Sequence, residues 1–186
     1  MNDLSHFSRQ AVLRDGTPVL VRAVQRDDRA RLVAAFHKLD PQSVYTRFFS
    51  FKKELSAADL ARLEATDFIH TVGLVATVSS GDDETIIGGG SYTLGAAADE
   101  ARVAELAFTV EEDYQGRGLA SALLALLAEI ARDQGIARLE AEVLAANTAM
   151  LAVFQHSGLP LTKTQRDGAV HVVLDLTPAA LEAGAR

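Results

Sequence analysis

The pattern of hydrophobic and polar positions in the first third of the chain predicts a strand followed by helices. From Val19 to Val24 apolar residues alternate around Arg22, as they do in a half-buried strand. Apolar residues then recur at helical spacing, so we expect about three short helices after this one strand. Their starts are marked by Asp27 and Asp28, by Asp40 with Pro41, and by the capping box of Ser56 and Asp59.

In the middle of the chain the pattern changes to that of strands. Residues 71–78 and 84–94 are rich in β-branched side chains, and the polar residues 79–83 between them predict a hairpin. The run Gly88–Gly90 indicates a bulge or a close approach of two backbones. A third strand is expected from about Arg102 to Val110.

A long helix and a second group of strands are predicted after residue 118. Leucine and isoleucine recur at helical spacing from Leu119 to Ile130, and Gly135 suits the position just beyond a helix end. The remaining elements form one α+β domain over residues 1–186, in which residues 178–186 are expected to fray. These elements are a strand at 139–144, a helix from Asn147 through Phe154, and two final strands ending near Leu176.

Composition narrows the classes of function. The 186 residues carry a formal net charge of -7, which is the wrong sign for nonspecific binding to nucleic acid or to an anionic membrane. Cys is absent and the five His lack metal-ligand spacing, so neither a Cys nucleophile nor a metal site is expected. The N-terminus lacks the apolar region of a secretory signal, and the longest apolar tract is shorter than a membrane span. We therefore expect a cytoplasmic protein.

The segment with the clearest chemistry is a glycine-containing turn between a strand and a long helix. Backbone amides converge in such a turn and the helix dipole adds positive potential, so a phosphate or pyrophosphate is the expected ligand. Gly116 and Gly118 permit close approach of that ligand, and Arg117 supplies a cation. The turn lacks the Lys-Ser/Thr pair of a P-loop and the third glycine of a dinucleotide fingerprint. From the glycine spacing alone, a purely structural strand-to-helix turn is an equal alternative.

The same turn resembles the pyrophosphate loop of the GNAT superfamily of N-acetyltransferases, with Gln115, Gly118 and Ala120 at the characteristic positions. This resemblance implies a mixed, mostly antiparallel sheet with a splayed central strand pair flanked by helices, and acetyl-CoA as acyl donor. The strand before the loop would pair with pantetheine. The donor-binding residues implied in this way are Phe108, Thr109, Val110, Gln115, Gly116, Arg117, Gly118, Leu119, Ala120, Asn147 and Phe154.

A narrower resemblance is to the catalytic domains of bacterial Pat-type protein lysine acetyltransferases. It rests on residues 41–49, 54–63 and 104–107, and it implies that Glu105 is the general base. A lysine acceptor, whose ordinary pKa is about 10.4, is mostly protonated at neutral pH and needs such a base. The alternative from the strand pattern alone is that Glu105 is not catalytic, and that it faces solvent or pairs with Arg102 or Arg138.

Two residues leave further alternatives open. Phe154 stands where many GNAT enzymes present a Tyr that protonates the leaving thiolate, and the phenols Tyr45, Tyr92 and Tyr114 have no assigned place at the sulfur. Asn147 is either only a helix cap or also a pantetheine contact.

We expect direct transfer of acetyl to a primary amine, with a protein lysine, such as one on an acyl-CoA synthetase, as acceptor. The alternatives are a small-molecule amine or amino acid as acceptor, or a non-catalytic acyl-CoA-binding module.

Overall fold

The computed structural model describes residues 3–48, 52–64, 66–81, 83–95 and 102–177. Within this part, eight strands form one sheet in the order β1-β2-β3-β4-β5-β6-β8-β7. Neighbouring strands are antiparallel except β5 and β6, which run parallel. The strands are β1 (Ser8–Val12), β2 (Pro18–Ala23), β3 (Thr71–Ser80), β4 (Asp83–Leu94), β5 (Val103–Val110), β6 (Arg138–Leu144), β7 (Leu161–Arg166) and β8 (Ala169–Asp175).

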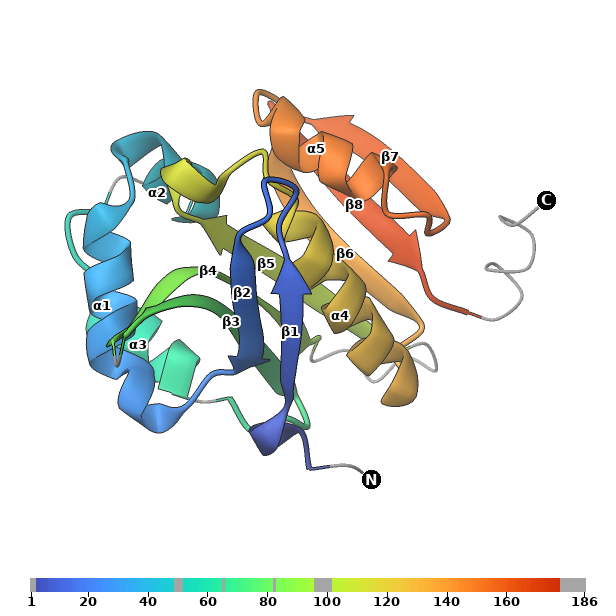
Figure 1. Ribbon diagram of the computed structural model, residues 1–186. Helices are drawn as coiled ribbons and strands as arrows, with labels where there is room; N and C mark the ends of the chain where they lie inside the picture. The colour runs from blue at the N-terminus through green and yellow to red at the C-terminus, as the bar shows by residue number, and fades with distance from the viewer. Residues whose placement is uncertain (1–2, 49–51, 65, 82, 96–101, 178–186) are drawn as a thin grey trace.

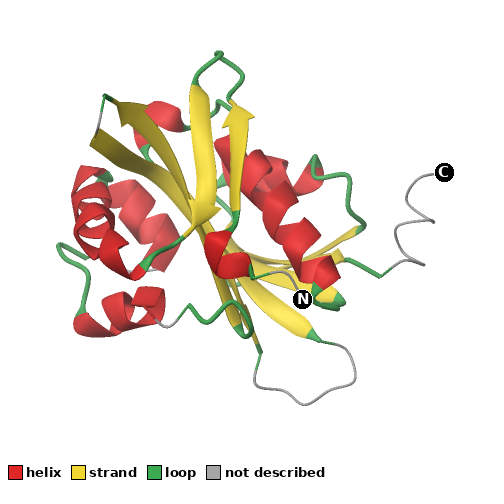
Figure 2. Ribbon diagram, turned by 60° about the horizontal axis from the view of Figure 1, so that its bottom comes forward, coloured by secondary structure: helices red, strands yellow, loops and turns green. Residues whose placement is uncertain are grey.

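Helices cover both faces of this sheet. Figure 1 and Figure 2 show α1, α2 and α3 against one face and α4 and α5 against the other, so the α+β class and the flanking helices are confirmed. The helices are α1 (Arg29–Lys38), α2 (Pro41–Phe48), α3 (Ala57–Glu64), α4 (Leu119–Asp133) and α5 (Thr148–Gln155), with short 3-10 turns η1 (Leu4–His6), η2 (Arg26–Asp28) and η3 (Glu112–Tyr114).

Helix α4 forms the centre of the main core. Its stripe Leu119, Leu123, Leu127 and Ile130 is at most 4% exposed, as its helical spacing predicts. The helix ends at Asp133, and just beyond its cap Gly135 has a φ of 72° and donates its N–H to Arg132 O. The predicted helix is therefore confirmed together with its glycine stop.

The glycines of β4 mark both a bulge and a close approach. The β3–β4 register places Ala76 opposite Gly88 but Thr77 opposite Ile86, so Ile87 is the extra residue of a bulge. A methyl group on Gly90 would lie only 2.7 Å from Phe108 Cδ1 of the neighbouring strand. Strands β4 and β5 can pack as they do only because these positions lack side chains.

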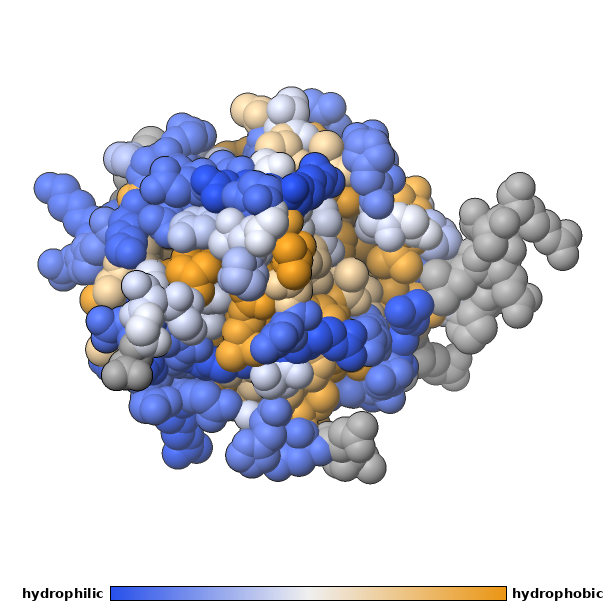
Figure 3. Space-filling model, viewed as in Figure 1, coloured by the Kyte–Doolittle hydropathy of each residue, from blue (hydrophilic) through white to orange (hydrophobic). Residues whose placement is uncertain are grey.

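The prediction of one strand in the first third was incomplete. Strand β1 pairs with β2 at the edge of the sheet, and its side chains are mostly exposed, Val12 by 70%. Such a strand carries no alternation of buried and exposed positions, so its sequence lacks the signal. Figure 3 shows hydrophobic side chains between bands of hydrophilic ones on the face that contains β1 and β2.

Two further expectations concern the ends of the chain and membranes. The tail predicted to fray, residues 178–186, lies outside the described residues. Among the described residues, none of the helices has the length and apolar character needed to span a membrane.

Candidate active site

The two parallel strands in the middle of the sheet separate after three residue pairs. Val103, Ala104 and Glu105 of β5 pair with residues 138–140 of β6, and beyond Glu105 these two strands no longer pair. Strand β5 continues to Val110 on its own on this side. Its backbone N–H and C=O groups there face a gap in the described sheet, which is the arrangement that accepts an extended chain by strand-like pairing.

The glycine turn lies directly after the separated end of β5. Gly116 and Gly118 have φ values of 70° and 92°, which non-glycine residues adopt at a cost, and α4 begins at Leu119. The first N–H groups of a helix have no partners within the helix, so this turn presents donors and partial positive charge to an anion. The side chain of Leu119 is buried in the core, so only its backbone belongs to this surface.

Side chains of the turn are held by neighbouring elements. Gln115 Nε2 donates hydrogen bonds to Val110 O (3.0 Å) and to Ser43 Oγ of α2 (3.2 Å). Arg117 Nη1 lies 2.6 Å from Asp15 Oδ2 in the β1–β2 turn, and its guanidinium stacks on Tyr114. The cation predicted at Arg117 is therefore balanced by a carboxylate that sequence reasoning missed.

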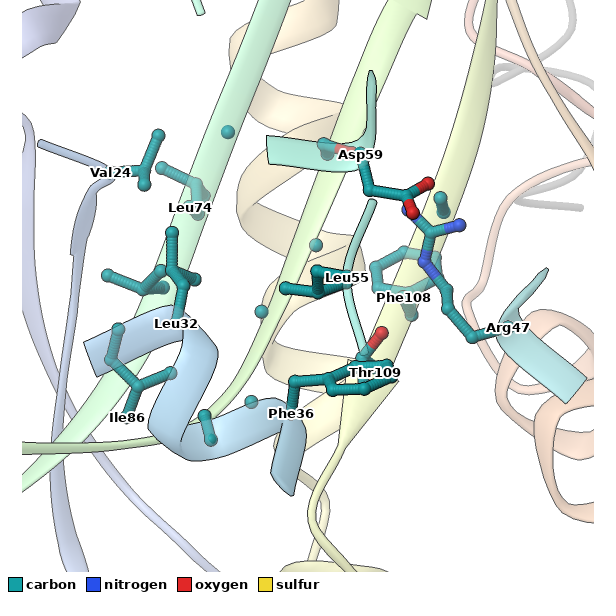
Figure 4. A pocket seen from close by; sticks show the side chains of 18 of the residues that line it. Val24, Leu32, Phe36, Arg47, Leu55, Asp59, Leu74, Ile86, Phe108 and Thr109 are labelled. Carbon is teal, nitrogen blue, oxygen red and sulfur yellow. The ribbon is translucent and has the colours of Figure 1, made fainter. Parts of the chain in front are cut away.

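A cavity of about 510 Å³ lies between helices α1–α3 and strands β3–β5. Among its lining residues, Figure 4 shows Leu32 and Phe36 of α1 and Phe108 and Thr109 of β5. Most of its lining is apolar, and four ionisable side chains contribute to it, namely Arg47, Asp59, Glu105 and Glu111. Its volume is in the range of pockets that bind small molecules or single side chains.

Glu105 occupies the point where the cavity meets the strand separation. It is the last residue of β5 paired with β6, it alternates with the cavity-lining Ala107 and Thr109, and it is exposed. Neither of the arginines considered as partners forms an ion pair with it, and Arg102 instead donates to Gln134 O. Within the described residues, its carboxylate is therefore available to a proton donor in the cavity.

The aromatic side chains of Phe154 and Tyr92 are buried. Phe154 is 1% exposed and packs edge-to-face against Phe108, with ring centroids 6.2 Å apart. Tyr92 is fully buried, donates to Gln134 Oε1 at 2.8 Å, and has a pKa raised above its ordinary value by burial. Tyr92 is thus unsuited to protonate a leaving thiolate.

Asn147 has the capping role that its position predicts. Its Oδ1 accepts the Met150 N–H at 3.1 Å at the start of α5. Together with Phe154 it comes from the far side of the gap, whereas the other predicted donor residues follow β5 and the glycine turn. Of the titratable residues described, no group of three or more His, Asp or Glu is arranged to hold a metal ion.

Comparison with known proteins adds the family. Residues 41–159 match the acetyltransferase (GNAT) family. The chain belongs to this family. Members use acetyl-CoA as acyl donor, so this GNAT protein is an acetyl-CoA-dependent N-acetyltransferase, as the sequence predicts.

Relatives of this GNAT domain include Pat-type enzymes. The crystal structure of the GNAT domain of S. lividans PAT is 40% identical, with a TM-score of 0.81 over 90% of this chain and 96% of that one. Acetyltransferase PA5475 of Pseudomonas aeruginosa is 34% identical over 74% of this chain and 73% of its own. Acetyltransferase Pat of Mycolicibacterium smegmatis is 29% identical over 89% of this chain, which spans only 48% of that relative.

Proposed function

We propose that this enzyme transfers acetyl from acetyl-CoA to a primary amine, with a protein lysine side chain as the preferred acceptor and Glu105 as general base. The observation that carries the proposal is the position of Glu105. Its carboxylate lies where β5 and β6 stop pairing and also lines the cavity under α1–α3. A donor in the gap and an acceptor in the cavity would meet at this residue.

The donor side of the site follows from the same geometry. Pantetheine would extend along the unpaired edge of β5 at Phe108, Thr109 and Val110, and the pyrophosphate would lie on the turn of residues 115–120. Asn147 and Phe154 would border the gap from α5. In this arrangement the donor is held mainly by backbone groups, which is consistent with the acidic net charge of the chain.

The transfer requires two protons to leave the nitrogen and one bond to be exchanged. The acceptor ammonium gives its first proton to the Glu105 carboxylate, directly or through water, and the neutral nitrogen attacks the thioester carbonyl carbon. The C–N bond forms, the nitrogen gives its second proton to solvent, and the C–S bond breaks. The CoA thiolate leaves and takes a proton from solvent. A thiol has an ordinary pKa of about 8.5, so its thiolate leaves without a dedicated acid, which agrees with Phe154 in place of a Tyr.

The lysine acceptor is supported by the two Pat-type relatives and by the charge of the cavity. The carboxylates of Glu105 and Glu111 line it, and an ammonium group is attracted to them, whereas the carboxylate of Asp59 is already paired with Lys52. The apolar remainder of the lining suits the methylene chain of lysine. An acyl-CoA synthetase is the protein substrate we would test first, and a cytoplasmic location stays a prediction from the sequence.

The cavity also favours a second candidate, a small amine or amino acid as acceptor. Its volume of about 510 Å³ is sufficient for a whole small molecule. Incubation with acetyl-CoA and, in parallel, acyl-CoA synthetases, lysine peptides and free amines distinguishes the two. Acetyl-lysine detected by mass spectrometry in a synthetase supports the lysine proposal, whereas acetylation of free amines alone contradicts it.

The role of Glu105 is tested by Glu105→Gln, with Glu140→Gln as matched control. Glu140 pairs in register with Glu105 but lies outside the cavity lining. We expect Glu105→Gln to lower kcat/KM about 10²- to 10⁴-fold while the Kd for acetyl-CoA stays unchanged, because only the proton acceptor is lost. Glu140→Gln should retain most activity. Unchanged turnover in Glu105→Gln would remove Glu105 from the mechanism, and a wild-type protein that binds acetyl-CoA without any turnover would indicate a binding module.

A further inference from the structure

The turn between β1 and β2 packs directly on the glycine turn that begins α4. Arg14 donates its backbone N–H to Arg117 O at 2.9 Å, and Asp15 forms the ion pair with Arg117 described above. Figure 1 shows the tip of the β1–β2 hairpin beside the start of α4. The two turns therefore form one continuous surface, although they are far apart in the sequence.

The side chain of Arg14 extends over this surface. A methyl group on Gly118 would lie 3.4 Å from Arg14 Nε and 3.5 Å from Arg14 Cγ, so the guanidinium lies beside the residue that caps the start of α4. Arg14 is exposed, and among the described residues its side chain has no carboxylate partner. By contrast, the charge of Arg117 is balanced by Asp15.

This placement of a cation is unfavourable for the protein on its own. The N-terminus of a helix carries partial positive charge, and acidic residues are favoured there whereas basic ones are disfavoured. The first turn of α4 contains no acidic residue, and an exposed arginine lies next to it. Both features become favourable when an anion binds between the guanidinium and the free backbone N–H groups.

We propose that Arg14 is a donor-binding residue that contacts the pyrophosphate of acetyl-CoA and supplies the uncompensated positive charge of that site. This rests on the proposed function, which places the pyrophosphate on residues 115–120. It changes the sequence prediction at one point: Arg117 holds the two turns together through Asp15, and Arg14 provides the net charge.

The test is the affinity of the full chain for three ligands, measured by isothermal titration calorimetry. CoA carries both the pyrophosphate and the 3′-phosphate, dephospho-CoA lacks the 3′-phosphate, and S-acetylpantetheine lacks both. We expect Arg14→Ala to weaken CoA and dephospho-CoA equally, by about tenfold or more, and to leave S-acetylpantetheine unchanged. The matched control is Arg26→Ala, because Arg26 is exposed beyond the opposite end of β2 and should bind CoA as the wild type does.

A second variant tests the role of charge separately. In Asp15→Asn the side-chain oxygen still accepts the Thr17 N–H, as Asp15 Oδ1 does at 3.0 Å, but the charge that balances Arg117 is lost. We expect CoA to bind this variant several-fold more tightly, most clearly at low salt. Weaker binding would show that the turn acts by position only and would overturn the charge argument.

The other possible results of the binding measurements also test the role proposed for Arg14. Equal CoA affinity of Arg14→Ala and wild type overturns the proposal, and so does a loss confined to CoA, which would assign Arg14 to the 3′-phosphate. Weakened S-acetylpantetheine binding would show a general disturbance of the gap and would overturn it too. If the wild type binds no CoA at all, the proposed function itself fails, and that result is distinct from each of these.

Discussion

At the scale of single residues, buried carboxylates in this protein are held charged by close partners. Asp59 lines the cavity, is 7% exposed, and closes the capping box of α3, where Lys52 Nζ lies 2.7 Å from one of its oxygens. Burial by itself would raise the pKa of Asp59, but the hydrogen bonds from Lys52 and Ser56 outweigh it and lower the pKa to about 2. A lowered pKa means that Asp59 stabilises the fold only while it is ionised.

The pH dependence of stability therefore tests Asp59. We expect Asp59→Asn to lower the free energy of unfolding by about 1–2 kcal/mol at pH 7, because the cap and the ion pair are weakened. The difference from wild type should be complete above pH about 4 and shrink as the pH falls toward 2, where wild-type Asp59 is protonated as well. Denaturant unfolding at several pH values measures this. A difference that stays constant with pH would contradict it.

At the scale of elements, the packing of β4 against β5 positions the separated strand. The ring of Phe108 packs closely against Gly90 and also contacts Phe154 of α5 on the other side of the gap. Phe108 is thus held by two elements that lie on either side of the proposed donor site. Any group added at Gly90 must displace this ring or Leu127, whose Cδ1 would lie 3.0 Å from a methyl group there.

We expect Gly90→Ala to reduce both stability and donor binding. Overpacking at this contact should cost about 1–3 kcal/mol in the free energy of unfolding and raise the KM for acetyl-CoA several-fold. Gly95→Ala is the matched control, because a methyl group there would lie 3.6 Å from Val103 O, an ordinary contact. Equal stability of the two variants by denaturant unfolding would show that β4 and β5 adjust without strain.

At the scale of the whole molecule, a network of ion pairs joins the start of α1, which lies over the cavity, to strands β2 and β4 of the sheet. Arg22 of β2 forms paired hydrogen bonds with Asp28 before α1 and with Glu84 of β4, all between 2.7 and 3.0 Å. Asp28 is fully buried, and its carboxylate binds Arg22 and the Gln25 N–H instead of capping α1, which corrects the simple capping role predicted for it. The network ties β2 and the turn before α1 to β4, which lies about sixty residues further along the chain.

Removal of the shared arginine should therefore be costly. We expect Arg22→Met to lower the free energy of unfolding by about 3–5 kcal/mol, because Asp28 is left as a buried charge without its main partner. Arg9→Met is the control: Arg9 pairs with Glu129 on the surface, both about half exposed, and its loss should cost about 1 kcal/mol or less. Similar losses in both variants, measured by chemical denaturation, would contradict a special role for the network.

The sequence by itself determined the local elements and the position of the glycine turn. Hydrophobic periods, caps and glycines act over a few residues, so α4, the β3–β4 hairpin and the glycine turn before α4 were predictable. Strand β1 was not, because an exposed edge strand exists through its pairing with β2 rather than through a pattern of its own.

Only the tertiary structure decided how these parts meet. The pairing of β5 with β6 stops at Glu105, and a cavity lies between helices α1–α3 and strands β3–β5. The β1–β2 turn brings Arg14 and Asp15 to the glycine turn. Each of these depends on residues that are distant in the sequence. The place where two strands stop pairing and the ion pairs between distant residues are set by the path of the whole chain, whereas a local pattern reports only on residues close in sequence.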